Sequence, residues 1–192
     1  MSSDQWPSVR AVGGILSADP KENPDFADAN HVFVPYCSSD SWSGTNIGAK
    51  KGSTAFMGNL IVQEVIRELA DYNQLLFAKE LYLAGSSAGA TGVLVNVDLV
   101  AKMVAKVGIL VRGIVDSGWF LDNQPFAGDC PNGQCHSVID DLKAGVELWG
   151  AKVPEGCLQE YPERWQCFIG YKAFPFIQCK FIPQKICQKR LM

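Results

Sequence analysis

Hydrophobic and polar positions along the chain follow two different periods in turn, which predicts alternating strands and helices. Residues 54–72 carry apolar side chains at helical spacing, and residues 88–107 form a long, largely apolar run; both patterns predict helices. Short runs rich in β-branched and aromatic residues predict strands at 31–37, 80–84 and 111–115. This order predicts an α/β fold with a parallel sheet and crossover helices.

The periodicity is weaker outside these segments. Residues 1–30 are polar and rich in turn-forming residues, which predicts a loop. After about residue 118 we expect loops with one further helix, at 138–149. The 192 residues suffice for one domain with a hydrophobic core.

Composition narrows the classes of function. The chain is 47% hydrophobic and carries a net charge of −3 with scattered basic residues, so a nucleic-acid partner is not expected. It has no uninterrupted apolar run of about 18 residues, so we expect no membrane span. The first residues lack the basic and apolar regions of a signal peptide.

The cysteines point to an oxidising compartment. There are seven, none forms a CxxC pair, and the chain has only two histidines, so no metal site is expected. Disulfides explain the cysteines better, although an odd count leaves at least one unpaired. Cysteine usage typical of secretion without a leader would fit a chain cut from a longer secreted protein.

The segment Gly85-Ser86-Ser87-Ala88-Gly89 predicts a catalytic serine. It follows a predicted strand and opens a predicted helix, the context in which a G-x-S-x-G serine is a nucleophile. Ser87 would attack, and the N–H of Ala88 would stabilise the oxyanion with the helix dipole. The alternative is a Gly/Ser-rich helix cap without chemistry, with Ser86 as an ordinary N-cap.

A catalytic serine needs a base and an acid. Ser87, Asp116 and His136 form the only set with a histidine in the chain order of α/β-hydrolases. Only 20 positions separate Asp116 from His136, which adjoins Cys135 in a loop, so we expect the true acid and base outside this chain. For His31, in the N-terminal strand candidate, a structural role is expected.

Several motifs in order resemble the pectin acetylesterase family, in particular its animal branch. They are VPYCSSDSWSG, AFMG, LAGSSAGATGVLVNVD, DSGWFLDN and WQCFIGYK. The resemblance runs to about Cys179 and implies that residues 1–192 are the central part of one α/β-hydrolase domain, with a divergent tail at 180–192. It also implies that the oxyanion loop lies before residue 1 and the catalytic Asp and His after residue 192.

The resemblance implies a secreted serine carboxylesterase that removes palmitoleate from Wnt proteins and so lowers Wnt signalling. No metal or organic cofactor is expected, and cell-surface glycans are a further expected partner. The alternatives are a polysaccharide (pectin) acetylesterase and a non-catalytic fragment that lacks the triad Asp and His.

Residue roles follow from the same resemblance. Ser87 matches the nucleophile and Ala88 the oxyanion donor, whereas Ala90 replaces a family glycine. The positions of the acyl pocket are Thr91, Phe120, Phe168 and Ile169, the last in place of an aromatic residue. A long acyl chain needs such apolar residues, since each buried CH₂ contributes roughly 0.8 kcal/mol; core packing is the alternative. The family's short disulfides would be Cys130–Cys135 and Cys157–Cys167, and Cys37 would need a partner from elsewhere.

Overall fold

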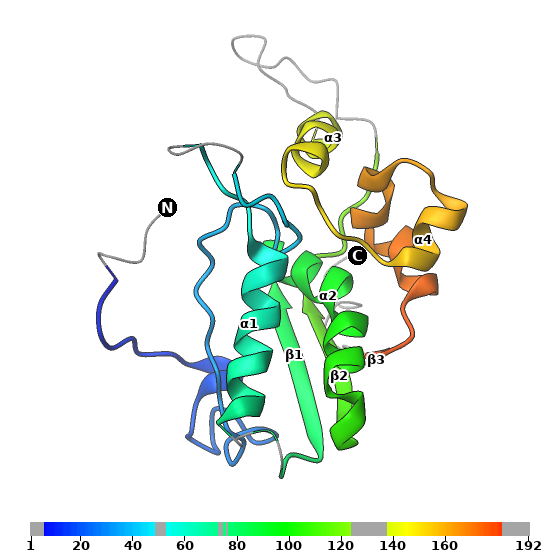
Figure 1. Cartoon of the computed structure of the whole chain (residues 1–192). Helices are drawn as coiled ribbons and strands as arrows, with labels where there is room; N and C mark the ends of the chain where they lie inside the picture. Colours follow the sequence, from blue (N-terminus) through cyan, green and yellow to red (C-terminus); the bar gives the residue numbers. More distant parts are fainter. Residues whose placement is uncertain (1–5, 49–52, 73–74, 76, 124–137, 182–192) are drawn as a thin grey trace. The chain divides into compact units, whose positions relative to one another are not determined.

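The computed structural model describes residues 6–48, 53–72, 75, 77–123 and 138–181 (Figure 1). The chain divides into two compact units, Met1–Cys37 and Ser38–Met192, which are described separately.

In its described residues, 6–37, the first unit consists of loops and turns with one short 3₁₀-helix, η1 (Gly14–Leu16). The buried side chain of Asn23 organises the loop, because its Nδ2 donates to the carbonyls of Ile15 and Ser17 at 3.0 and 2.9 Å. His31 contacts the carbonyl of Phe26 through Nε2 at 2.9 Å, in line with the structural role expected of it.

The strand predicted at 31–37 is wrong. No residue of 31–37 belongs to a strand or a β-ladder in the part of the chain that the structure describes, and Val32 and Phe33 are exposed. A strand needs a neighbour that satisfies its N–H and C=O groups, and Pro35 has no N–H to offer. An apolar run alone is therefore not sufficient to form a strand.

The second unit is built around a parallel sheet in the order β1-β2-β3. Strand β1 (Glu80–Ser86) pairs with β2 (Leu110–Asp116) along its whole length, from Glu80 opposite Leu110 to Ser86 opposite Asp116. The predictions for 80–84 and 111–115 are thus confirmed. The sequence did not predict β3 (Lys180–Phe181), which is only two residues long.

Two long helices pack with this sheet. Helix α2 (Ala88–Val104), continued by η2 (Ala105–Val107), is the crossover between β1 and β2 and lies against both strands (Figure 1). Its valines form the main core with residues of α1 (Gly58–Asp71) and of the strands; the buried set is Ile66, Leu75, Val93, Val97, Val100, Val104, Ile109 and Val111. Both predicted helices are confirmed, although α1 begins four positions later than expected because Phe56 pairs with Asn46 in a β-bridge.

Helix α2 explains an apparent membrane signal. Within the described part of the chain, Ala88–Val107 is the one helix long and apolar enough to cross a membrane, and 56% of its most apolar stretch is buried in the protein. A helix that is apolar on all sides is typical of a protein interior as well as of a membrane. The packing on β1 and β2 accounts for its composition.

The C-terminal part is more helical than expected. Helix α3 (Val138–Leu148) confirms the prediction for 138–149, but loops were expected where α4 (Glu155–Glu160), η4 (Arg164–Phe168), α5 (Gly170–Ala173) and η5 (Phe174–Phe176) are found. Helices of three to six residues are too short to show a helical period. They are held by tertiary contacts, including the disulfide Cys157–Cys167 that the resemblance implied.

Candidate active site

Ser87 occupies the turn between β1 and α2. Its φ of 55° and ψ of −119° place a residue with a Cβ in a sparsely populated backbone region, as a strained strand-to-helix turn requires. The residue is exposed, and its side chain makes no capping hydrogen bond to the helix. The geometry leaves the hydroxyl free of a capping role.

The neighbouring Ser86 does not cap the helix either. Its Oγ donates to Oδ2 of Asp116 at 2.8 Å, and Ser117 Oγ donates to Oδ1 of the same carboxylate at 3.2 Å. The Asp116 carboxylate therefore accepts hydrogen bonds from two serine hydroxyls beside the turn. His136, the third member of the internal triad, lies outside the described residues, as do Cys130 and Cys135.

The small residues of the turn differ in how strictly they are required. A Cβ on Gly85 would overlap the carbonyl of Gly89, so the strand and helix backbones approach each other there as the motif predicts. A Cβ on Gly89 would meet nothing within 4 Å. Only the first glycine is therefore required by space.

The start of α2 provides donors beside Ser87. The N–H groups of Ala90 and Thr91 already bond to the Ser87 carbonyl, at 3.0 and 3.2 Å. The N–H of Ala88 belongs to the first turn, where a helix leaves its N–H groups without helical partners and its dipole is positive. The turn can thus favour negative charge near the Ser87 hydroxyl.

The residues expected to bind an acyl chain come from three neighbouring elements. Thr91 is buried on α2, Phe168 and Ile169 are buried at the end of η4, and Phe120 is 40% exposed after β2. Helix α2 contacts η4 and α5. Phe168 also packs on the ring of Trp149, with 6.2 Å between centroids, so it contributes to a second core cluster.

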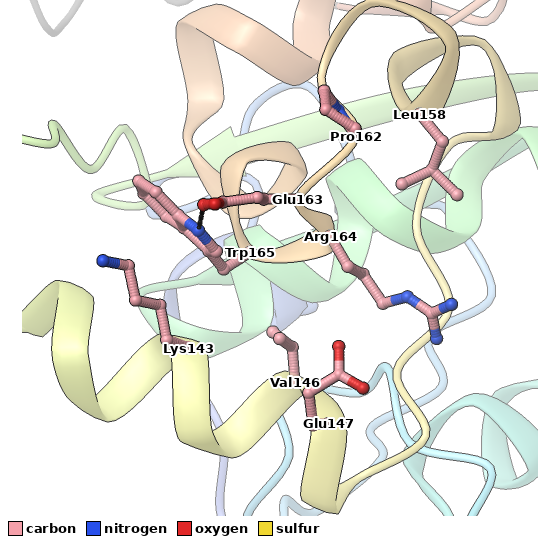
Figure 2. Close-up of a pocket in the computed structure, with 8 residues that line it drawn as sticks. All are labelled: Lys143, Val146, Glu147, Leu158, Pro162, Glu163, Arg164 and Trp165. Atoms are coloured by element: carbon pink, nitrogen blue, oxygen red, sulfur yellow. Dashed lines mark hydrogen bonds between the residues drawn. The ribbon is translucent and has the colours of Figure 1, made fainter.

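A cavity of about 560 Å³ lies elsewhere in this unit (Figure 2). It is bordered by α3, α4 and η4, and its charged side chains are of both signs, Lys143 and Arg164 with Glu147 and Glu163. Trp165 lies at its edge and donates its indole N–H to Glu163. None of the residues expected to bind an acyl chain lines this cavity.

Sequence reasoning missed Asp40, a completely buried carboxylate. Its Oδ1 accepts bonds from Ser38 Oγ at 2.5 Å and Trp42 N at 3.0 Å, and its Oδ2 from Gly58 N at 2.7 Å and Gly44 N at 3.1 Å. Asp40 therefore shapes the 38–44 loop and satisfies the first N–H of α1. The only signal was its position in a motif rich in serine and glycine.

The loop shaped by Asp40 braces α2 close to Ser87. The Trp42 ring lies so close to Gly92 that a Cβ there would come within 2.6 Å of it. Asn96 Nδ2 donates to the Trp42 carbonyl at 2.8 Å, and Asn59 Nδ2 of α1 donates to Asn96 Oδ1 at 2.7 Å. Buried, satisfied amides of this kind fix one arrangement of their helices.

Cys179 is a free, partly buried thiol beside Asp98. Burial, followed by the hydrogen bond and charge of Asp98, raises the pKa of its thiol to about 12. Asp98 accepts hydrogen bonds from the backbone N–H groups of Gln178 and Cys179, which anchors the chain before β3. A thiol that stays protonated at neutral pH is a poor nucleophile.

In the described residues, no three His, Cys, Asp or Glu side chains are grouped so that they could hold a metal ion.

Comparison with known proteins gives the family. The sequence model described as Pectinacetylesterase matches residues 1–185. The palmitoleoyl-protein carboxylesterases NOTUM of Mus musculus and Homo sapiens are each 49% identical over 185 residues, and NOTUM of Drosophila melanogaster is 43% identical over 187. These matches include 93% of this chain, but the chain spans only 37% of the mouse and human relatives.

The fold agrees with this likeness. The crystal structure of the Wnt deacylase Notum from Drosophila superimposes with a TM-score of 0.85 at 42% identity, over 95% of this chain and 53% of that one. The predicted α/β-hydrolase fold class and the resemblance stated from the motifs are confirmed. The boundary of a divergent tail at residue 180 stays a prediction. By both sequence and fold, this chain belongs to the pectinacetylesterase family.

Proposed function

We propose that the protein is a serine carboxylesterase that removes a long-chain acyl group, palmitoleate on Wnt proteins, with Ser87 as nucleophile. The observation that carries the proposal is the backbone of Ser87, which holds an exposed, uncapped hydroxyl on the strand-to-helix turn. Relatives named palmitoleoyl-protein carboxylesterase and a structure described as a Wnt deacylase support the substrate.

The chemistry would proceed in two halves. Ser87 Oγ attacks the ester carbonyl as its proton passes to a general base, and the Ala88 N–H and the dipole of α2 stabilise the oxyanion. The alcohol leaves with a proton and an acyl-serine remains, which water then hydrolyses. We assign the base to no described residue; a His136→Ala variant tests the internal triad with Asp116.

A long acyl chain would favour contact with apolar side chains, which the segments after β2 and at the end of η4 provide. We propose that Thr91, Phe120, Phe168 and Ile169 contact the chain, since burial of each CH₂ contributes roughly 0.8 kcal/mol. The competing candidate is deacetylation of a polysaccharide, which the description of the family favours. An acetyl group would use almost none of this apolar surface.

The disulfide in the C-terminal part of the chain bears on where the protein acts. We propose that the protein acts outside the cell, which the disulfide Cys157–Cys167 supports because such bonds persist in oxidising compartments. Cell-surface glycans are proposed as a further partner.

The test uses the protein at its full natural length. Hydrolysis of p-nitrophenyl octanoate and of a palmitoleoylated Wnt peptide is measured for the wild type and for Ser87→Ala. Ser86→Ala is the matched control, since it removes the neighbouring hydroxyl that bonds to Asp116. We expect Ser87→Ala to lose at least about 10³-fold in kcat and Ser86→Ala to keep most activity. Equal rates for wild type and Ser87→Ala would refute the assignment, and activity on acetyl esters alone would favour the polysaccharide substrate.

A further inference from the structure

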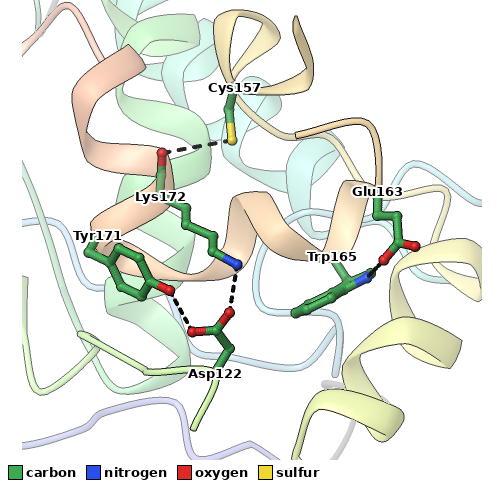
Figure 3. A network of polar contacts seen from close by, with 6 residues as sticks. All are labelled: Asp122, Cys157, Glu163, Trp165, Tyr171 and Lys172. Atoms are coloured by element: carbon green, nitrogen blue, oxygen red, sulfur yellow. Dashed lines mark hydrogen bonds and ion pairs between the residues drawn. The ribbon is translucent and has the colours of Figure 1, made fainter. Parts of the chain in front are cut away.

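The two segments proposed to contact the acyl chain are fastened together by one carboxylate. Asp122 lies two residues after Phe120, and Tyr171 and Lys172 follow Phe168 and Ile169 on α5. Asp122 Oδ2 forms a 2.5 Å ion pair with Lys172 Nζ, and Oδ1 accepts a 2.6 Å hydrogen bond from the Tyr171 hydroxyl (Figure 3).

The ion pair is partly shielded from solvent. The side chain of Lys172 is 11% exposed and that of Asp122 is 22% exposed, against 56% and 60% for the surface pair Arg67 and Glu64. The Lys172 ammonium also lies 5.4, 5.5 and 5.7 Å from the ring centroids of Tyr161, Trp165 and Tyr171. Cation–π contacts of this kind strengthen when they are desolvated, so the ammonium is held in one place.

The charges of this cluster reinforce each other. Hydrogen bonds from Lys172 and then Tyr171 lower the pKa of the Asp122 carboxyl. Burial acts to lower the pKa of Lys172, but the hydrogen bond and charge of Asp122 outweigh it, and the pKa is raised. Both groups are therefore charged at neutral pH.

The two residues before Phe120 are anchored as well. The ring of Trp119 packs on Gly170, where a Cβ would come within 2.8 Å of it, and meets Phe174 edge-on with 5.8 Å between centroids. Gly118 sits so close to α2 that a Cβ there would overlap Ala90 and approach the Ser87 carbonyl to 3.1 Å. The 118–122 segment is thus anchored both to the turn that carries Ser87 and to α5.

We propose that the Asp122–Lys172 pair is a positioning device that sets the acyl-chain selectivity of the site. It acts by holding Phe120 at a fixed place relative to Phe168 and Ile169, so that a long fatty acyl chain is contacted from both segments. The inference rests on the proposed function and adds to it the residues that would determine the preferred length of the substrate's acyl chain. Neither charged group would touch the reacting ester.

The experiment compares chain lengths in the full-length protein. The kcat and KM values for p-nitrophenyl octanoate and acetate are measured for wild type, Asp122→Asn, Lys172→Met and Lys172→Arg. Arg67→Met is the matched control, because it removes an exposed ion pair on α1. The variants Asp122→Asn and Lys172→Met should lower the octanoate-to-acetate ratio of kcat/KM by roughly tenfold, mainly through KM. Lys172→Arg keeps the charge and the ring contacts and should restore most of the ratio.

A second readout does not need turnover. Binding of palmitoleic acid to the Ser87→Ala protein is measured by calorimetry with and without Asp122→Asn, and roughly tenfold weaker binding is expected. Should Lys172→Met fail to fold, Asp122→Asn and Lys172→Arg carry the test.

The outcomes separate the two proposals. An equal loss on octanoate and acetate, or an unchanged ratio together with unchanged binding, would overturn the positioning role. Equal turnover in the wild type and in Ser87→Ala would refute the proposed function. Weaker binding of palmitoleic acid in Asp122→Asn would still support the positioning role in that case.

Discussion

The backbone N–H of Ser87 donates a 2.9 Å hydrogen bond to the carbonyl of Asp116, so the candidate nucleophile is tied to the end of the neighbouring strand. The bond continues the parallel ladder of β1 and β2 one residue beyond the last paired position, Ser86 with Asp116. The strained backbone of Ser87 is thereby fixed by the sheet on one side and by α2 on the other.

The two glycines of the turn should respond differently to the same substitution. Gly85→Ala forces a Cβ into the Gly89 carbonyl, and we expect it to lower the free energy of unfolding by roughly 1–3 kcal/mol. In Gly89→Ala the added Cβ lies in open space on a helix, so the free energy of unfolding should be unchanged or higher by up to about 1 kcal/mol. Urea unfolding of both variants measures this, and equal destabilisation would contradict the geometry described for the turn.

Removal of the Asp40 carboxylate should be costly. In Asp40→Ala the four donors bonded to it lose their acceptor in a buried place, and we expect a loss of roughly 3 kcal/mol in unfolding free energy. Asp71→Ala, at an exposed position at the end of α1, is the control and should change stability by less than about 0.5 kcal/mol. Similar effects in the two variants would refute the role given to Asp40.

Alanine substitutions at Phe168 and Phe120 should distinguish a role in core packing from a role in binding the acyl chain. Phe168→Ala empties a buried position beside Trp149 and Val146, so stability should fall by roughly 3–5 kcal/mol. Phe120→Ala removes a half-exposed ring, so stability should fall by less than about 1 kcal/mol while KM for octanoate rises. Thermal unfolding and steady-state kinetics measure both. A Phe120→Ala variant with unchanged KM would exclude Phe120 from the acyl site.

The Asp122–Lys172 pair predicts a pH window. The folded pKa of Asp122 is lowered, so its contribution to stability is present above the unfolded pKa of about 3.9 and is lost as the pH falls through the folded value. The folded pKa of Lys172 is raised, so its contribution is present below about 10.4 and is lost as the pH rises through the folded value. The stability difference between wild type and Asp122→Asn should therefore be constant from about pH 5 to 9 and shrink in acid. A difference that changes steadily across neutral pH would contradict the pairing.

The central βαβ unit could be predicted from the sequence because its signals are local. The apolar run of α2 and the short runs of β1 and β2 each carry their own period, and the Ser87 turn lies where one gives way to the other. By contrast, α4, η4 and α5 are too short for a period and depend on the Cys157–Cys167 bond and on packing around Phe168. The pairing of Asp122 with Lys172 joins residues 50 positions apart, which no local pattern could reveal.

Covalent labelling tests the role of Ser87 most directly. The full-length protein is treated with a fluorophosphonate, which forms a phosphorus–oxygen bond with an activated serine and releases fluoride, and the labelled peptide is identified by mass spectrometry. We expect one modified residue, Ser87, with labelling abolished in Ser87→Ala, retained in Ser86→Ala and slowed by a palmitoleoylated Wnt peptide. Labelling of another serine in the active protein, or undiminished labelling of Ser87→Ala, would contradict it.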